Sequence, residues 1–210
     1  MTIAVIDYGM GNLRSVLQAL LKVAPDRDTR VTSDPAEVVA AERVVFPGQG
    51  AMPDCMAELE RRGLRSAVLQ AAAEKPFLGV CIGLQMLFEQ SEEGDARGLG
   101  VFPGQARRFA NPLLDAGQKK LKVPHMGWNQ VWRQGQHPLW AGIEDGARFY
   151  FVHSYCVFPT DTALVAGRCE YGLPFTCAVG RANIFAVQFH PEKSARDGLQ
   201  LLKNFVSWQP

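Results

Sequence analysis

Short apolar segments alternate with longer amphipathic segments through the first half of the chain. Strands are predicted by the apolar runs at Thr2–Ile6, Arg30–Thr32, Val44–Phe46 and Phe77–Val80. Helices are predicted by apolar residues at helical spacing over Leu13–Val23, Asp54–Ala73 and Gly83–Glu89. Strands that alternate with helices indicate a parallel sheet that is covered on both faces.

The second half of the chain is rich in strand patterns separated by turn residues. Strands are predicted at Ala106–Phe109, Gln130–Trp132, Phe149–Tyr155, Ala163–Cys169, Thr176–Val179 and Ile184–Phe189, before a last helix at Arg196–Trp208. With little helix between them, these strands are expected to be antiparallel. We therefore expect an α/β fold with a mixed, mainly parallel sheet, helices on both faces and an additional small antiparallel sheet.

Length and charge narrow the class of protein. The 210 residues contain no repeat and no obvious linker, so we expect a single domain over residues 1–210. A net charge of +1 argues against a nucleic-acid partner, because phosphate contacts need a clustered basic surface. No segment has the apolar length of a membrane span, and the first residues lack a signal-peptide pattern. We expect a cytoplasmic protein with no membrane contact.

The number and spacing of the five cysteines bear on disulfides, metal binding and compartment. Their number is odd and no pair has the C-x-x-C spacing. A disulfide framework and a zinc site are therefore disfavoured, and a reducing compartment is favoured. No metal and no cofactor are expected.

One cysteine has the sequence context of a nucleophile. Gly79-Val80-Cys81-Ile82-Gly83 joins a predicted strand to a predicted helix, which is the pattern of a nucleophile elbow with cysteine in the reactive position. The glycines would relieve crowding at a sharp turn. A helix that begins directly after Cys81 would favour the thiolate over the thiol. The alternative, a buried structural cysteine, does not explain the paired glycines.

A cysteine nucleophile needs a base, and His190 is the best candidate. It follows a predicted strand and precedes Pro191-Glu192. In extended chain, residues two apart point to the same side, so Glu192 is expected to accept a hydrogen bond from the His190 ring. His153 also ends a predicted strand, but no carboxylate lies within two residues of it, so we assign it to the wall of the site. His125 and His137 are predicted in loops, and neither is given a catalytic role.

Attack on an amide creates a negative oxygen that needs hydrogen-bond donors. The Ile82 backbone N–H, directly after the nucleophile, is one expected donor. The loop Pro47-Gly48-Gln49-Gly50 is expected to supply the second, from Gln49 or Gly50. Gln85 lies one helical turn after Cys81, where its amide would meet the polar end of a small substrate.

These residues together resemble the class I glutamine amidotransferase family. The matching motifs are Pro47-Gly48-x-Gly50, Gly79-Val80-Cys81-x-Gly83-x-Gln85 and His190-Pro191-Glu192. The resemblance implies the three-layer fold of that family. It also implies the hydrolysis of L-glutamine by a triad of Cys81, His190 and Glu192, with Gly50, Gln85, Ser154 and Tyr155 holding the substrate.

Further segments narrow the resemblance to the glutaminase subunits that supply ammonia for imidazole glycerol phosphate synthesis. These segments are Asp7–Asn12, Pro124–Asn129, Tyr150–Tyr155 and Gln188–Ser194. The resemblance implies a cyclase subunit, a (β/α)8 barrel, as partner in a 1:1 heterodimer, with a role in histidine biosynthesis. It places Asn12, Met126, Trp128 and Tyr150 at the docking face, although Trp128 would equally suit a packed core.

Other interpretations remain open from the sequence. A related amidotransferase subunit would serve anthranilate, aminodeoxychorismate or guanylate synthesis, and the Pro124–Asn129 segment speaks against it. A cysteine peptidase or a redox sensor would use the same fold for different chemistry. A non-catalytic binding subunit would not need the complete triad.

Overall fold

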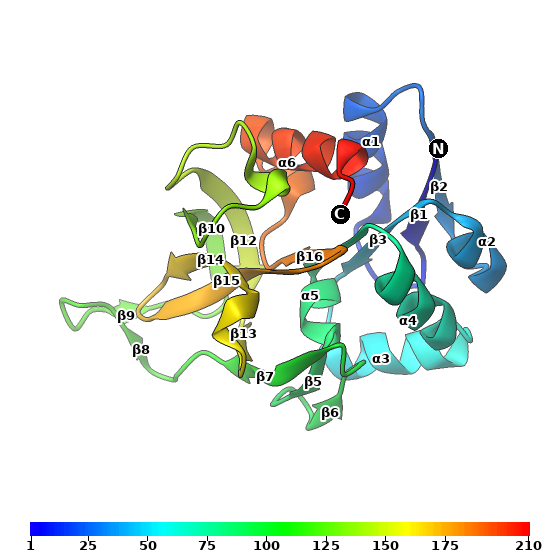
Figure 1. Cartoon of the computed structure of the whole chain (residues 1–210). Helices are drawn as coiled ribbons and strands as arrows, with labels where there is room; N and C mark the ends of the chain where they lie inside the picture. The colour runs from blue at the N-terminus through cyan, green and yellow to red at the C-terminus, as the bar shows by residue number, and fades with distance from the viewer.

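A twelve-stranded sheet runs through the computed structural model, which describes residues 1–210 (Figure 1). The strands follow the order β2-β1-β3-β4-β16-β15-β13-β7-β5-β6, and β14 and β11 extend the sheet beside β15. Their bounds are β1 Thr2–Ile6, β2 Asp28–Thr32, β3 Arg43–Gly48, β4 Phe77–Cys81, β5 Phe88–Ser91, β6 Ala96–Arg97, β7 Phe102–Arg108, β11 Trp132–Arg133, β13 Tyr155–Pro159, β14 Val165–Glu170, β15 Pro174–Arg181 and β16 Ile184–Val187.

The parallel part of this sheet brings the ends of three strands together. Strands β2, β1, β3, β4 and β16 are parallel, whereas β15 runs antiparallel to β16. In this register Gly48 lies beside Cys81, and Val80 lies beside Val187. Sites in such sheets form at the carboxyl ends of the strands, so the segments after β3, β4 and β16 meet at one edge.

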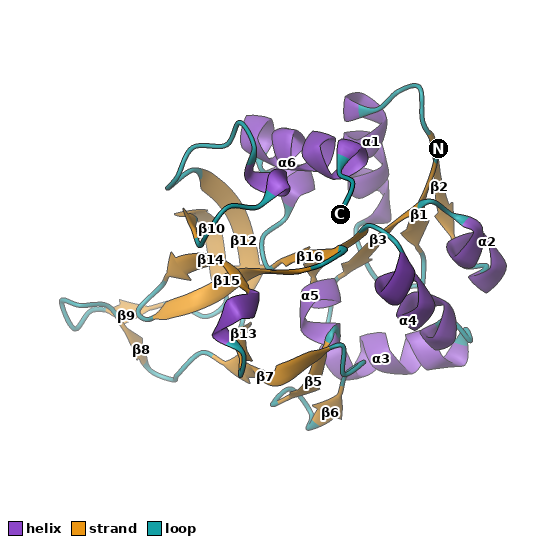
Figure 2. Ribbon diagram, viewed as in Figure 1, coloured by secondary structure: helices purple, strands orange, loops and turns teal.

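Helices cover both faces of the parallel strands (Figure 2). They are α1 Leu13–Val23, α2 Pro35–Ala40, α3 Met52–Arg61, α4 Arg65–Glu74, α5 Ile82–Met86 and α6 Ala195–Ser207. Helices α1 and α6 pack together on one face, and the opposite face is covered by α3, α4 and α5. The strands β1, β3, β4 and β16 between these layers are almost completely buried, as expected for parallel strands with helices on both sides.

Two small antiparallel sheets and three 3₁₀ turns complete the fold. One sheet pairs β10 His125–Gln130 with β12 Arg148–His153, and the other pairs β8 Leu113–Leu114 with β9 Lys120–Leu121. The 3₁₀ turns are η1 Pro138–Trp140, η2 Thr162–Leu164 and η3 Pro191–Lys193. None of the helices combines the length and the apolar character that crossing a bilayer requires.

Most predicted elements are present, but two predicted helices are wrong in extent. The helix expected over Asp54–Ala73 is two helices, α3 and α4, because Gly63 takes φ +66° between them. The helix expected over Gly83–Glu89 ends at Met86, and Phe88 begins strand β5. Helix α5 therefore has five residues, and its dipole favours a thiolate less than a full-length helix would.

The strand predicted over Phe149–Tyr155 belongs to two different sheets. Strand β12 ends at His153, and β13 begins at Tyr155 in the large sheet, so Ser154 lies at the junction. The strand predicted over Ile184–Phe189 ends at Val187. The prediction of His125 in a loop is also wrong, because this residue opens β10 and is buried.

Candidate active site

Cys81 lies at the end of β4 in a strained backbone conformation. Its φ of 56° is in the left-handed region that non-glycine residues rarely adopt. The two flanking glycines have the steric role expected of an elbow. A Cβ on Gly79 would lie 2.9 Å from the Ala186 Cβ, and one on Gly83 would lie 1.9 Å from the Phe46 carbonyl oxygen. The turn that presents the sulfur therefore depends on both glycines.

His190 and Glu192 form a buried pair. Nδ1 of His190 lies 2.9 Å from Oε1 of Glu192, and their side chains are 5% and 2% exposed. The predicted contact is present, but the extended-chain reason for it is wrong. Only His190 is extended, at φ −102° and ψ 98°, and Pro191 then begins the 3₁₀ turn η3. This turn brings the carboxylate back to the ring.

Backbone contacts fix the position of His190. Its N–H donates to the Tyr150 carbonyl (2.9 Å), and its own carbonyl accepts from the Ser194 hydroxyl (2.6 Å). The Tyr150 N–H in turn donates to the Ser194 hydroxyl (3.0 Å). A Cβ on Gly198 would lie 2.0 Å from the Pro191 carbonyl oxygen, so helix α6 packs directly on the turn. Strand β12, the turn η3 and helix α6 together hold the backbone that carries the imidazole.

The electrostatic surroundings of His190 favour its protonated form. Burial lowers the pKa of the ring, but the Cys81 sulfur and the Glu192 carboxylate outweigh burial and raise the pKa to about 10. Nε2 of His190 is buried and makes no hydrogen bond, so this proton donor is unoccupied beside the sulfur. The arrangement therefore places a protonated imidazole, which can act as a proton donor, at the cavity that Cys81 lines.

Two glutamine side chains connect the nucleophile to the pocket wall. Nε2 of Gln188 lies 3.7 Å from the Cys81 sulfur, to which it donates. Nε2 of Gln85 donates to Oε1 of Gln188 (3.1 Å) and to the Tyr155 carbonyl (3.3 Å). Oε1 of Gln85 is buried without a partner, which leaves it free to accept from a ligand. Sequence reasoning gave Gln188 no role, and its place two residues before His190 is the only signal that could have found it.

A cavity of about 240 Å³ collects the predicted residues. Its walls include Gln49, Gly50, Cys81, Ile82, Gln85, Ser154, Tyr155 and His190, and Glu192 lies behind His190. This volume is below the range of about 300–1,000 Å³ that is typical of drug-sized ligands, so a small substrate is favoured. The other lining residues are Glu93, Pro124, Val152 and His153.

Glu93 is a pocket residue that sequence reasoning missed. Its Oε2 accepts from the Met52 N–H (2.7 Å), which fixes the carboxylate at the wall of the cavity. The residue lies in a turn after β5, beyond the helix that was predicted to end at Glu89, and no motif marked it. Its negative charge suits a substrate with an ammonium group.

The predicted oxyanion loop lies against the nucleophile. Gly48 pairs with Cys81, and a Cβ on Gly48 would lie 2.8 Å from the Ile82 Cβ. Gly50 takes φ +107°, a conformation that favours glycine. Gln49, Gly50 and Ile82 all border the cavity that Cys81 lines, so the residues predicted to supply the oxyanion donors lie at one pocket.

The predicted docking residues are not equally exposed. Met126 is 62% exposed and Trp128 is 47% exposed, so the alternative of Trp128 as a core residue is wrong. The Trp128 ring contacts Tyr150 edge to face, with centroids 6.1 Å apart. Tyr150 and Asn12 are partly buried. Strand β10 thus presents two apolar side chains to solvent, with an aromatic neighbour from β12.

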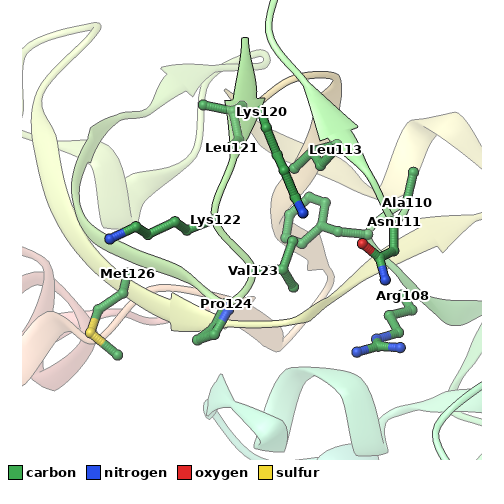
Figure 3. Close-up of a pocket in the computed structure, with 11 residues that line it drawn as sticks. Arg108, Ala110, Asn111, Leu113, Lys120, Leu121, Lys122, Val123, Pro124 and Met126 are labelled. Atoms are coloured by element: carbon green, nitrogen blue, oxygen red, sulfur yellow. The ribbon is translucent and has the colours of Figure 1, made fainter.

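A second, larger pocket borders the first but holds none of the triad (Figure 3). It encloses about 630 Å³ between the end of β7, the β8–β9 hairpin and the start of β10. Arg108, Lys120 and Lys122 lie around it, and none of them forms an ion pair. Pro124 lines both pockets, so they share a wall.

The remaining thiols lack the surroundings of Cys81. Burial raises the pKa of Cys55 to about 11 and the pKa values of Cys156 and Cys169 to about 12, and it raises the pKa of Cys177 as well. All five cysteines are free, and only Cys81 lines the candidate active site. The structure contains no group of three or more His, Cys, Asp or Glu side chains that could hold a metal ion.

The sequence and the fold match those of a known class of enzyme. The family model of class I glutamine amidotransferases matches residues 4–208. A solved structure of PurLQS from Thermotoga maritima has a similar fold, with a TM-score of 0.73 and 17% sequence identity over 98% of this chain and 97% of that chain. The chain belongs to the class I glutamine amidotransferase family, with that family's mixed, mostly parallel sheet.

Sequence comparison narrows the family further. Imidazole glycerol phosphate synthase subunit HisH of Dechloromonas aromatica is 71% identical over 100% of this chain and 97% of that protein. The subunit of the same name from Aromatoleum aromaticum is 64% identical over 99% of each chain. Within the amidotransferases, the chain belongs to the HisH subunits of imidazole glycerol phosphate synthase.

Proposed function

We propose that residues 1–210 form a single glutaminase domain that hydrolyses L-glutamine to L-glutamate and ammonia through a thioester on Cys81. The observation that carries this proposal is the convergence of Cys81 with the buried His190–Glu192 pair at a small cavity. The high pKa of His190 supports it, because a thiolate and an imidazolium are the reactive forms for attack on an amide.

In the first half of the reaction, the Cys81 thiolate attacks the side-chain amide carbon of glutamine and forms a C–S bond. The oxyanion accepts from the Ile82 N–H and from the N–H of Gln49 or Gly50. The C–N bond then breaks as His190 gives its proton to the departing nitrogen, which leaves as ammonia. His190 is neutral at this stage, and Glu192 holds its Nδ1–H.

In the second half, water attacks the thioester carbon and His190 takes the proton from that water. The C–S bond breaks, glutamate leaves, and Cys81 returns to the thiolate beside a protonated His190. Atoms and charges balance over the cycle: glutamine and water give glutamate, ammonia and one proton, which the new side-chain carboxyl group releases. No metal or cofactor takes part in these steps.

The pocket walls suit the polar ends of glutamine. Oε1 of Gln85 has no partner in the structure and is an acceptor for the substrate's ammonium group. The Glu93 carboxylate supplies a charge for the same group. Backbone groups at Ser154 and Tyr155 would complete the set of groups that bind glutamine. This assignment predicts discrimination against substrates that lack the α-ammonium group.

We infer a partner that receives the ammonia. The relatives are named as subunits of imidazole glycerol phosphate synthase, which favours a role in histidine biosynthesis over the anthranilate, aminodeoxychorismate or guanylate alternatives. We therefore propose that the partner is a cyclase subunit, a (β/α)8 barrel, in a 1:1 heterodimer. In neutral water ammonia becomes ammonium, which is not a nucleophile, so a closed route to the cyclase avoids that loss. Asn12, Met126, Trp128 and Tyr150 are proposed at the docking face. Five free thiols are consistent with the cytoplasm as the site of action.

Covalent labelling tests the proposed chemistry. A glutamine-like electrophile should modify Cys81 alone, and glutamine should protect it. Cys81→Ala should abolish labelling and reduce glutamate release more than tenfold. Glutamate release by Cys81→Ala within tenfold of the wild-type rate would contradict the thioester. Peptides offered in parallel should not be cleaved, and their cleavage would favour the peptidase alternative.

Co-purification tests the proposed partner. The full chain, used as bait in its own organism, should capture a (β/α)8-barrel cyclase in equal amount. Glutaminase turnover should rise when this cyclase and its nucleotide substrate are added, because uncoupled hydrolysis wastes glutamine. Equal rates with and without the cyclase, or capture of a different synthase, would overturn this part of the proposal.

A further inference from the structure

Two buried histidines outside the triad face each other at the pocket wall, where His153 lines the cavity and His125 lies behind it. His125 begins β10 and His153 ends β12, and the two residues are paired across the antiparallel ladder. Nδ1 of His125 lies 2.9 Å from Nε2 of His153, and both residues are buried. Buried polar atoms need partners, so the direction of this hydrogen bond determines what each ring does.

The surrounding groups fix that direction. Nδ1 of His153 lies 2.8 Å from the Tyr155 carbonyl oxygen, which only accepts, so this nitrogen carries the proton. Burial lowers the pKa of His153 to about 3 and that of His125 to about 4, so both rings are neutral. Nε2 of His153 is then an acceptor, and Nδ1 of His125 is the donor.

The same logic extends to Asn129. With its proton on Nδ1, His125 has an acceptor at Nε2, and Nδ2 of Asn129 lies 3.2 Å from it. This amide nitrogen also donates to the Glu170 carbonyl (2.8 Å). The His125 ring is stacked between Tyr171 (centroids 4.0 Å apart) and Phe151 (4.9 Å). Hydrogen bonds set the tautomer of His125, and stacking sets the plane of its ring.

The chain of hydrogen bonds ends at the wall of the glutamine pocket. The Tyr155 carbonyl accepts from His153 Nδ1 and also from Gln85 Nε2, 3.3 Å away. Ser154 and Tyr155 join β12 to β13, which lie in different sheets, and both residues line the cavity. Tyr155 lies opposite Arg108 at the start of the β13–β7 ladder, and the Ser154 carbonyl accepts from the Phe109 N–H (3.0 Å). The two side-chain donors therefore add to this backbone pairing and act on the Tyr155 carbonyl itself.

We propose that His153, oriented by His125, is a positioning residue that holds the Ser154–Tyr155 backbone and the Gln85 amide in place for glutamine. This inference rests on the proposed function of the cavity as a glutamine site. His153 takes no part in proton transfer, because both of its ring nitrogens are occupied in the neutral ring. It acts on substrate binding through the Tyr155 carbonyl.

Two substitutions of His153 distinguish the roles of its two ring nitrogens. The amide nitrogen of Asn occupies nearly the position of Nδ1 in His, and the amide of Gln reaches the position of Nε2. His153→Asn keeps the donor to the Tyr155 carbonyl, so the KM for glutamine should stay within about threefold of wild type. His153→Gln loses that donor, and the KM should rise about tenfold with a smaller change in kcat. His137→Asn, at a partly buried histidine outside the cavity, is the matched control and should leave KM unchanged.

A purely structural role would not produce this pattern. Both His153 variants lose volume and should unfold at lower temperature, so stability alone would move their KM values together. Equal KM values for His153→Asn and His153→Gln would overturn the inference. A fall in kcat with unchanged KM in both variants would also overturn it.

Nitrogen-15 NMR of the full chain, labelled at histidine, gives an independent readout. At neutral pH the signals of His125 and His153 should be those of neutral rings protonated at Nδ1. Each signal is assigned by its loss in the variant that replaces the histidine with Asn. An imidazolium signal or an Nε2–H tautomer at His153 would overturn the inference. This readout does not depend on glutaminase activity, whereas failure of the proposed function would appear as unlabelled Cys81 or active Cys81→Ala.

Discussion

A Cβ atom on Gly83 would lie 1.9 Å from the carbonyl oxygen of Phe46, so the backbone of α5 touches the backbone of β3 without an intervening side chain. This contact joins the nucleophile elbow to the strand that leads into the oxyanion loop. The obstacle is a backbone carbonyl, which cannot move aside by rotating a side chain. The spacing between the two elements is therefore set by the absence of one methyl group.

Gly83→Ala should destabilise the protein by about 3 kcal/mol, the upper end of the usual cost of overpacking. Chemical denaturation of the full chain measures this change. Gly117→Ala is the matched control, because that glycine is exposed in a turn and its nearest obstacle is a side-chain atom 3.4 Å away. The control should stay within about 0.5 kcal/mol of wild type. Equal stability of the two variants would contradict the close packing of α5 on β3.

Glu192→Gln should lower kcat about 100-fold, because the neutral amide no longer stabilises the imidazolium form of His190. The Glu192 carboxylate is one of the groups that raise the pKa of His190 to about 10. Without it His190 loses its proton at lower pH, so the alkaline limb of the kcat/KM profile should shift to lower pH. Steady-state rates across the pH range measure both effects.

The exposed Glu144 supplies the control for that experiment. Glu144→Gln removes the same charge far from the cavity and should reproduce the wild-type profile. A Glu192→Gln enzyme with unchanged kcat and an unchanged alkaline limb would exclude Glu192 as the partner of the base.

Acid should destabilise the fold through two buried histidines, His125 and His153, and the partly buried His137. Burial lowers the pKa values of His125 and His137 to about 4 and that of His153 to about 3, below the ordinary value of 6.5. Protons then bind the unfolded chain more strongly. Stability from these groups is fully present above pH 6.5 and is lost as pH falls from there through the folded-state values. Each histidine contributes a slope of about 1.4 kcal/mol per pH unit within that window.

His137→Asn should reduce the pH dependence of the free energy of unfolding by the contribution of one histidine. His137 accepts from the Leu139 N–H at the start of η1, and asparagine preserves this acceptor without titrating. The variant loses ring contacts with Phe185 and Trp208, so its stability should be lower at every pH. Denaturation curves between pH 4 and pH 6.5 give the slope. A slope identical to wild type would contradict a lowered pKa at His137. His190, whose pKa is raised, does not change the slope in this window.

Trp128→Ala should weaken binding of the proposed partner by about 2 kcal/mol, or about 30-fold in Kd, as expected for a tryptophan near the centre of an interface. Titration calorimetry with the co-purified cyclase measures the affinity. Trp132→Ala is a close control, because Trp132 is 46% exposed, compared with 47% for Trp128, but lies on β11 in the large sheet. Equal loss of affinity in both variants would remove Trp128 from the docking face.

Sequence patterns predicted the elements whose signals are local. Thr2–Ile6 and Leu13–Val23 have the predicted bounds, because an apolar run and a helical period are complete within each segment. The break at Gly63 and the end of α5 at Met86 depend on tertiary packing, which overrides a continuous helical pattern. The chain passes from one sheet to another at Ser154, and the alternation of apolar and polar residues does not indicate this change.

In the candidate site, too, residues with local sequence signals were predicted and residues defined by tertiary contacts were missed. Cys81, His190 and Glu192 were predicted because each lies in a motif with a chemical reason. Gln188 and Glu93 were missed because their roles depend on contacts with residues distant in sequence, the Cys81 sulfur and the Met52 N–H. The reason given for the His190–Glu192 contact was wrong because a 3₁₀ turn and an extended chain both bring a residue close to the second one after it.

Four of the five thiols are buried outside the cavity that Cys81 lines, and this has a practical consequence for preparations of this protein. Cys55, Cys156, Cys169 and Cys177 resist alkylation in the folded chain because burial raises their pKa values. One equivalent of a slow alkylating reagent would therefore count competent molecules, as an active-site titrant does. The same count made after denaturation would give five, and the ratio would report the folded fraction of a sample.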